Sequence, residues 1–287
     1  MTQTNTPAQR TSFRELLAEP GITQVMGAHD GLLARIAARA GFKALYHGSF
    51  AVASTHGVPD IALVGLGETA AGVRRVTGAV DIPVIADADT GYGNEAAVYN
   101  TVRVLERAGA SAIQIEDQVF PKRCGHMPGK EVIDRDLMLS KIRTACDARR
   151  DPETVIIART DSLQGHGVDE ALSRCNDFAE AGADVVFADA PETEDDLRTV
   201  AAAAAPSMAN MTETGKTPLL PAQQLEELGF AVVIYPSNQI WTIAGAFERL
   251  CRAVIDSGGT ESVRAEMLPF AEVNEILGLE TYQELES

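Results

Sequence analysis

The sequence predicts a (β/α)8 barrel, a TIM-type fold of the α/β class, and three observations support this prediction. A phrase made of a helix-ending glycine and an apolar run recurs four times, starting at Ala40, Ala108, Ala181 and Leu228. The glycine suits the left-handed residue that closes a helix, and the apolar run suits a buried parallel strand. Eight such runs alternate with helix-compatible segments, and polar residues follow most of them, which is typical of a barrel.

The expected elements follow one another along most of the chain. Strands are expected at residues 22–27, 43–48, 82–88, 111–117, 154–160, 184–189, 207–211 and 230–235, with helix-compatible segments between most of them. A doubly wound parallel sheet is the alternative arrangement. Against it, no GxGxxG sequence follows the first strand, as the dinucleotide-binding version of that fold requires.

The two ends of the chain lie outside the repeated unit. Residues 1–11 are expected to form a flexible tail, and residues 12–287 a single barrel domain. After the eighth strand come a helix around 238–256, a Gly258-Gly259 break and a helical extension from about residue 257. The extension packs either on the chain's own barrel or on a neighbouring subunit by exchange of helices, and the sequence leaves both open.

The composition argues against several classes of function. The chain has 24 basic and 41 acidic residues and a net charge of −17, whereas nucleic acid or an anionic membrane would need a basic surface. Residues 1–12 lack the apolar core of a signal peptide, and no stretch is apolar enough to span a membrane, so a soluble cytoplasmic protein is expected. The cysteines lack CxxC spacing, which argues against disulfides or structural zinc; they are Cys124, Cys146, Cys175 and Cys251.

Residues 122–126 read Lys-Arg-Cys-Gly-His and predict a reactive thiol. Lys122, Arg123 and His126 would favour the thiolate of Cys124 or ease proton exchange at its sulfur, whereas an inert core cysteine usually lies among apolar residues. The other three cysteines are expected to pack within helices.

Carboxylates collect at the ends of the third and fourth expected strands. Asp87 and Asp89 alternate along one face of the third strand, and Glu116 and Asp117 end the fourth. Close carboxylates repel one another unless a cation or a proton separates them, and hard oxygen ligands suit Mg²⁺ or Mn²⁺ held partly through water. The alternative is that these acids cap the loops and helices that follow.

Other polar residues are expected at the same end of the barrel. Arg159 ends the fifth strand, where its guanidinium could hold a substrate carboxylate bidentately, form a salt bridge to one of the acids, or do both. Asn210 and Thr212 follow the seventh strand, and Tyr46-His47-Gly48-Ser49 follows the second. His29, His47 and His56 are interpreted as structural. The set predicts a site for an oxyanionic small molecule.

At these residues the chain resembles the isocitrate lyase and phosphoenolpyruvate mutase superfamily of (β/α)8 barrels, over about residues 12–287. The resemblance is carried by Ala-Asp-Thr-Gly-Tyr-Gly at 88–93, Ile-Glu-Asp-Gln at 115–118, Lys-Arg-Cys-Gly-His at 122–126, Ala-Arg-Thr-Asp at 158–161 and Asn-Met-Thr-Glu at 210–213. Cys124 and its neighbours resemble the carbon–carbon lyase branch rather than the phosphonate mutases.

The resemblance implies roles for individual residues. It implies Mg²⁺ at Asp87, Asp89 and Glu116, with Mn²⁺ as a substitute. Cys124 would be the acid that protonates the departing carbon, and the remaining catalytic residues would be Tyr46, Asp60, Arg159 and His126. The implied substrate contacts are Gly48, Ser49, Gly125, Arg159, Asp189, Asn210, Thr212 and Pro236.

The sequence also departs from the family pattern. Family lyases commonly read Ser-Gly where this chain has Gly48-Ser49, and they carry a glutamate where this chain has Asp189. Members that cleave a tricarboxylate carry arginines at the positions of Trp241 and Phe270. Loss of two cations disfavours a third substrate carboxylate, since each charge-assisted contact is worth roughly 1.5–3 kcal/mol.

The implied activity is Mg²⁺-dependent retro-Claisen cleavage of a 2-hydroxy dicarboxylate such as 2,3-dimethylmalate. The products would be a 2-oxo acid such as pyruvate and a succinate-type or other carboxylate. Cleavage of 2-methylisocitrate, hydrolysis or decarboxylation of oxaloacetate, and a barrel that only binds a metabolite remain alternatives. The resemblance further implies a homotetramer built as a dimer of helix-swapped dimers.

Overall fold

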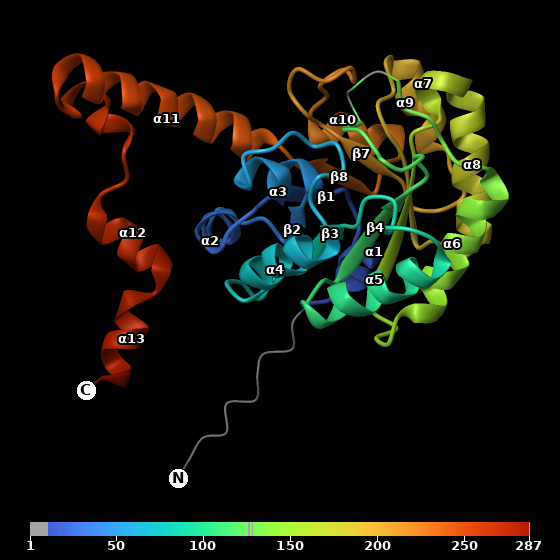
Figure 1. Cartoon of the computed structure of the whole chain (residues 1–287), viewed down its shortest axis with the longest axis horizontal. Coiled ribbons are helices and arrows are strands. Elements are labelled where there is room, and N and C mark those ends of the chain that lie inside the picture. Colours follow the sequence, from blue (N-terminus) through green and yellow to red (C-terminus); the bar gives the residue numbers. More distant parts are fainter. Residues whose placement is uncertain (1–10, 126, 128, 287) are drawn as a thin grey trace, which may run out of the picture.

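The computed structural model in Figure 1 describes residues 11–125, 127 and 129–286. Its eight strands form one parallel sheet in the order β6-β5-β4-β3-β2-β1-β8-β7. An isolated parallel bridge between Val186 and Ser207 joins β6 to the start of β7, so that the sheet nearly closes into a barrel. The predicted barrel is therefore confirmed, and the doubly wound alternative is wrong. The strands are β1 (Thr23–Gly27), β2 (Ala44–His47), β3 (Val84–Asp87), β4 (Ala112–Glu116), β5 (Val155–Thr160), β6 (Val185–Ala188), β7 (Met208–Asn210) and β8 (Val232–Tyr235).

Every expected strand is present, and each end lies within two residues of the prediction. The four recurring glycines, Gly41, Gly109, Gly182 and Gly229, have φ between +92° and +110° just after a helix, as their role in ending helices requires. The helices are α1 (Phe13–Ala18), α2 (Gly31–Arg39), α3 (Ser49–Thr55), α4 (Leu66–Thr77), α5 (Glu95–Arg107), α6 (Arg135–Ala148), α7 (Leu163–His166), α8 (Val168–Glu180), α9 (Glu194–Ala201), α10 (Ala222–Leu228), α11 (Asn238–Ser257), α12 (Phe270–Leu277) and α13 (Leu279–Leu285), with a 3-10 helix at Glu261–Glu266.

The two ends of the barrel differ in chemistry. Phe13 and Leu16 of α1 are buried in the same apolar cluster as the first residues of several strands, including Ala112 and Val155. Arg14 Nη2 also donates to Asp184 Oδ1 at 2.8 Å, just before β6. Helix α1 thus closes the end where the strands begin, and the carboxyl ends of the strands form the mouth that carries polar residues.

The C-terminal extension leaves the barrel (Figure 1). No residue of α11, α12 or α13 is buried, and Phe270 is 86% exposed in the described chain. Contacts with the chain's own barrel are sparse, such as Arg35 Nη1 donating to the Ile276 carbonyl at 3.2 Å. In the described part of the chain, no helix has the length and hydropathy needed to cross a membrane.

Candidate active site

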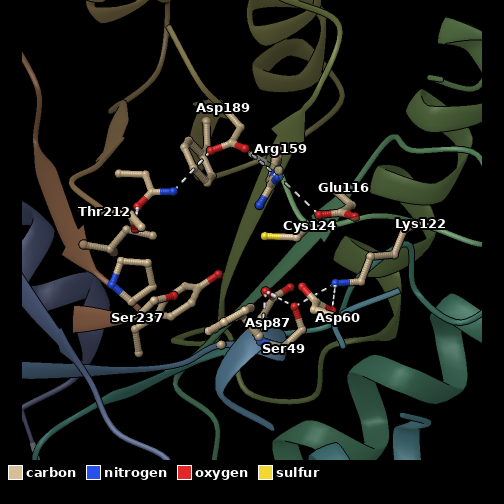
Figure 2. A pocket seen from close by; sticks show the side chains of 18 of the residues that line it. Ser49, Asp60, Asp87, Glu116, Lys122, Cys124, Arg159, Asp189, Thr212 and Ser237 are labelled. Atoms are coloured by element: carbon tan, nitrogen blue, oxygen red, sulfur yellow. Dashed lines mark hydrogen bonds and ion pairs between the residues drawn. The ribbon is translucent and has the colours of Figure 1, made fainter. Parts of the chain in front are cut away.

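The candidate site is a cavity of about 50 Å³ at the mouth of the barrel (Figure 2). On this measure one water needs roughly 10–15 Å³, so the cavity suits a small molecule. All but two of the predicted site residues line it: Tyr46, Gly48, Ser49, Asp60, Asp87, Glu116, Cys124, Gly125, Arg159, Asp189, Asn210, Thr212 and Pro236. Asp89 lies beside it in an adjoining pocket with Ser49 and Asp60. His126 falls outside the described residues, so its predicted role stays a prediction.

Arg159, at the end of β5, is buried among three carboxylates. Its Nε and Nη2 atoms donate to the two Asp161 oxygens at 2.9 and 2.8 Å, and Nη2 also donates to Asp189 Oδ2 at 2.7 Å. Glu116 Oε2 lies 3.4 Å from Nε, and the guanidinium carbon stacks 5.3 Å from the centre of the Phe187 ring. The predicted salt bridge is therefore present. The predicted bidentate grip on a substrate does not fit this arrangement, because Asp161 occupies the Nε–Nη2 edge and leaves Nη1 for a ligand.

The electrostatics of this cluster follow from burial. Burial opposes the charged form of Arg159, but Asp161, Asp189 and Glu116 together hold its pKa above the usual value. Burial also opposes the charged form of Asp161, which by itself would raise the pKa of this carboxyl. Arg159 and Lys130 nevertheless hold that pKa well below its usual range. Arg159 and Asp161 are thus both charged at neutral pH.

Asp87 and Asp89 are arranged differently from the prediction. Strand β3 ends at Asp87, and Asp89 has a φ of +48°, so strand alternation does not extend to Asp89. Asp87 Oδ1 accepts from the Asp89 backbone N–H at 3.1 Å, and Asp87 Oδ2 accepts from Ser49 Oγ at 3.0 Å. The Ser49 hydroxyl in turn accepts from Lys122 Nζ at 2.9 Å. The inverted Gly48-Ser49 pair therefore places its hydroxyl against the acid cluster.

Lys122 is a buried counter-ion of the acids. Its Nζ lies 2.5 Å from Asp60 Oδ1 and 2.8 Å from Asp89 Oδ1, and its side chain is 3% exposed. Even so, burial, with Asp87 and Asp60 nearby, raises the pKa of Asp89 to about 6. The sequence interpretation assigned Lys122 to Cys124, whereas in the structure its charge is directed at carboxylates.

Glu116, which ends β4, has an oxygen with no partner among the described residues. Its Oε1 atom is buried and accepts no hydrogen bond, and burial, with Asp161 and Asp87 nearby, raises the pKa of the carboxyl well above its usual value. Such an oxygen is either protonated or ready to take a cation.

The donor set fits a partly hydrated divalent cation. Within the described ranges, no three histidine, cysteine, aspartate or glutamate side chains lie so that they alone could hold a metal ion. Lys122 occupies the place between Asp60 and Asp89, which leaves Asp87 and the unpartnered Glu116 oxygen as the available donors. Mg²⁺ commonly takes one or two carboxylates and keeps several waters, so this arrangement suits it.

Cys124 and Gly125 enter the mouth from the segment that follows β4. Figure 2 shows the Cys124 sulfur between the Arg159 and Asp87 sides of the pocket, and its backbone N–H donates to the Asp60 carbonyl at 3.1 Å. A Cβ atom on Gly125 would overlap with Asp189 Oδ2 and Arg159 Nη2. Asp189 is one methylene shorter than the glutamate that the resemblance implies at this position, and it reaches Arg159 and accepts from Asn210 Nδ2 at 3.3 Å.

The other predicted residues have mixed outcomes. Tyr46 donates from its hydroxyl to Gln114 Oε1 at 3.0 Å, and burial, with Asp87 nearby, raises its pKa well above 10. Cys175 is buried in α8, as expected, and burial raises its pKa to about 12. Cys251 is exposed on α11 in the described chain, so the packing expected for it is not seen. His47 is buried outside the cavity, which agrees with a structural role, and burial lowers its pKa to about 4.

Sequence reasoning missed several residues that shape the site. Asp161 lies two residues after Arg159 and could have been found from its place in the Ala-Arg-Thr-Asp phrase. The side chain of Lys130 is 1% exposed and donates to Asp161 Oδ1 at 2.6 Å, and a loop lysine carries no signal for burial. Phe50 lines the cavity and packs on Trp241 with ring centroids 4.9 Å apart.

Comparison with known proteins identifies the family of this fold and site. A family model described as phosphoenolpyruvate phosphomutase matches residues 13–255. The chain belongs to the phosphoenolpyruvate mutase/isocitrate lyase superfamily. It is 41% identical over 276 residues to a 2,3-dimethylmalate lyase from Eubacterium barkeri, covering 96% of each chain. It is 38% identical to a 2-methylisocitrate lyase from Halalkalibacterium halodurans, covering 96% of this chain and 91% of the relative.

Solved structures of this superfamily support the same assignment. An oxaloacetate acetylhydrolase in complex with 3,3-difluorooxalacetate superposes with a TM-score of 0.90 and 31% identity, covering 96% of this chain and 95% of that one. A phosphonopyruvate hydrolase in complex with oxalate and Mg²⁺ has a TM-score of 0.86 and 30% identity, covering 95% and 96%. The superfamily therefore includes Mg²⁺-binding members, and this chain is a carbon–carbon lyase of the oxo-acid lyase type.

The close approach of Gly125 generates a prediction. Gly125→Ala should lower kcat/KM by roughly 10²-fold or more, because a methyl group there displaces Arg159 and Asp189, and small misplacements at an active site can cost that much. Gly165→Ala is the matched control, since its Cβ would meet nothing within 4 Å. Steady-state kinetics of both variants, with thermal melts, check it. Equal activity in the two variants would show that the Gly125 contact has no role.

Proposed function

We propose that this protein is a Mg²⁺-dependent lyase that cleaves an alkylmalate-type 2-hydroxy dicarboxylate, with 2,3-dimethylmalate as the model substrate. One observation carries the proposal: the Cys124 sulfur lies in the same small cavity as the Nη1 side of Arg159 and the carboxylates of Asp87 and Glu116. An acid, an anion-binding group and cation ligands are thus within reach of one small molecule. The 41% identity to a 2,3-dimethylmalate lyase supports the substrate.

The metal would be held by Asp87 directly and by Glu116 directly or through water. When bound, Mg²⁺ supplies positive charge to the oxygen on which negative charge develops during cleavage. Asp89 would act through Lys122, which is hydrogen-bonded to the Ser49 hydroxyl and through it to Asp87. This arrangement keeps the carboxylate positions rigid, as a cation site needs.

The residues of the chain account for the proton movements. Tyr46 keeps its proton at neutral pH because its pKa is raised, so Asp60 is the candidate acceptor for the proton of the substrate 2-hydroxyl. As that proton leaves, the C2–C3 bond breaks, a carbonyl forms at C2, and the electron pair passes to C3 and its neighbouring carboxylate. Cys124 then donates its thiol proton to C3, which gives a 2-oxo acid and a second carboxylic acid. Proton exchange with solvent restores both residues.

The cavity wall near α11 favours a dicarboxylate over a tricarboxylate. The resemblance implies an arginine at the position of Trp241 in members that cleave a tricarboxylate, whereas Trp241 packs on the pocket residue Phe50. Two other cations of this region, Lys216 and Arg252, lie outside the cavity, whereas Arg123 lines it. Lys216 Nζ lies 3.0 Å from Glu192 Oε1, Arg252 Nη2 lies 2.6 Å from Glu248 Oε1, and neither side chain lines the cavity. An apolar wall suits an alkyl substituent, and an unpaired buried carboxylate there would be costly.

The extension supports a proposal about assembly. The uncovered apolar side chains of α11 to α13 would be buried if these helices packed on a neighbouring subunit, as expected for a homotetramer of helix-swapped dimers. A cytoplasmic location accords with the metabolic lyases that the chain resembles.

The role of Cys124 gives a direct prediction. Cys124→Ser should lower kcat by at least roughly 10²-fold, because a serine hydroxyl is a far weaker acid than a thiol, while the affinity for Mg²⁺ and product stays near that of the wild type. Cys251→Ser, at an exposed cysteine on α11, is the control. Turnover of the Cys124 variant within threefold of wild type would remove this residue from the mechanism.

Substrate preference tests the proposed function itself. The value of kcat/KM for 2,3-dimethylmalate should exceed that for 2-methylisocitrate at least tenfold, since one charge-assisted contact is worth roughly 1.5–3 kcal/mol. The same kinetic assay is run with oxaloacetate and phosphonopyruvate as further substrates. In addition, Trp241→Arg should lower the ratio of kcat/KM for 2,3-dimethylmalate to kcat/KM for 2-methylisocitrate. Phe247→Arg, further along α11, should leave this ratio unchanged. A wild-type preference for 2-methylisocitrate or oxaloacetate would contradict the proposal.

A further inference from the structure

Lys130 is buried at the mouth of the barrel although it lies in the segment that carries Cys124. Its side chain is 1% exposed, and Nζ lies 2.6 Å from Asp161 Oδ1 and 3.8 Å from Asp189 Oδ2. A buried ammonium group is costly unless carboxylates compensate it, so this placement needs both acceptors. Lys130 does not line the cavity that holds Cys124. Lys130 therefore makes no direct contact with a ligand in that cavity, and it can act only through its charge and its two carboxylate partners.

The partners of Lys130 are also the partners of Arg159. Arg159 Nη2 lies 2.8 Å from Asp161 Oδ1 and 2.7 Å from Asp189 Oδ2, the same oxygens that face Lys130. Together with Glu116 they place three carboxylates around two cations. Without Lys130, one guanidinium would face all three. Its Nη1 side would then lie in a negative potential that opposes the approach of a carboxylate.

We propose that Lys130 is a positioning residue that preserves the anion affinity of Arg159. By neutralising Asp161 and part of Asp189, it lets these carboxylates orient the guanidinium without cancelling its charge toward the cavity. The inference rests on the proposed function, because it requires that Arg159 binds a substrate carboxylate. It deepens that function by naming a residue outside the cavity on which substrate affinity depends.

Three substitutions at this position separate charge from packing. Lys130→Gln keeps a donor for Asp161 but removes the charge, Lys130→Met removes both, and Lys130→Arg keeps the charge. Lys216→Met is the control, because Lys216 pairs with Glu192 outside the cavity and is 40% exposed. Each variant is assayed for KM and kcat with 2,3-dimethylmalate and titrated calorimetrically with oxalate in the presence of Mg²⁺. Oxalate is a small dianion that a related hydrolase binds.

The expected result is a loss of affinity that follows the charge. As an order of magnitude, two unit charges about 7 Å apart in an effective dielectric of about 20 interact with an energy equivalent to roughly a 50-fold change in affinity. KM and the oxalate Kd should therefore rise roughly 10- to 50-fold in Lys130→Gln and Lys130→Met, with kcat within about threefold. Lys130→Arg and Lys216→Met should stay within threefold of wild type on both measures.

Several outcomes would overturn the inference. Wild-type affinity in Lys130→Gln would show that hydrogen bonding or packing suffices, and a loss of thermal stability or kcat with unchanged KM and Kd would show a purely structural role. If Lys130→Met does not fold, the Gln and Arg variants carry the comparison. Failure of the wild type to cleave any tested substrate contradicts the proposed function alone. The oxalate titration still decides on Lys130 in that case, and no oxalate binding by the wild type would overturn the inference.

Discussion

The organisation of the site depends on an excess of buried carboxylates over buried cations. Asp60, Asp87, Asp89, Glu116, Asp161 and Asp189 converge on the mouth of the barrel, and Lys122, Lys130 and Arg159 are their cationic partners among the described residues. Each cation contacts two or more acids. Such clusters are stable only when nearly every charge is matched or removed by a proton. The carboxylates without a full cationic partner, Asp87 and Glu116, are therefore the part of the site where a cation is expected to bind.

The barrel separates this costly cluster from the parts of the molecule that stabilise it. Phe13 and Leu16 fill the end where the strands begin, and an apolar layer packs between the strands and the outer helices. The strands deliver Asp87, Glu116 and Arg159 from three neighbouring positions in the sheet, so their spacing is set by backbone pairing such as that of Glu116 with Arg159. A rigid frame of this kind allows charges to be held close together where flexible loops would let them separate.

Much of the fold and part of the site were predictable from the sequence. The strands and the helix-ending glycines were predictable because burial on both faces and a left-handed residue leave direct sequence signals. The line of acids and Arg159 at the strand ends was predictable for the same reason. The position of Asp89 was not predictable, because the strand ends at Asp87 and the positive φ of Asp89 changes the direction of its side chain. Alternation describes a strand only while the strand continues.

Long-range pairings could not be predicted from local patterns. Lys122 was interpreted as a neighbour of Cys124 along the chain, but its side chain reaches Asp60, 62 positions away. Lys130 gave no signal at all, since burial of a lysine depends on acids supplied by other strands. The resemblance indicated that Trp241 lies near the substrate, and its packing on Phe50 places it behind the cavity wall. Residues whose role is to balance charge are visible only once the fold has brought the charges together.

The most direct test of this account is the binding of Mg²⁺ to the metal-free protein, measured by isothermal titration calorimetry. The carboxylate excess predicts one Mg²⁺ per chain, with binding lost in Asp87→Asn and retained in Asp151→Asn, whose acid lies at the opposite end of the barrel beside Glu106. Activity should disappear in EDTA and return when Mg²⁺ is added back. Wild-type protein that binds no divalent cation, or that keeps full activity in EDTA, would contradict the account.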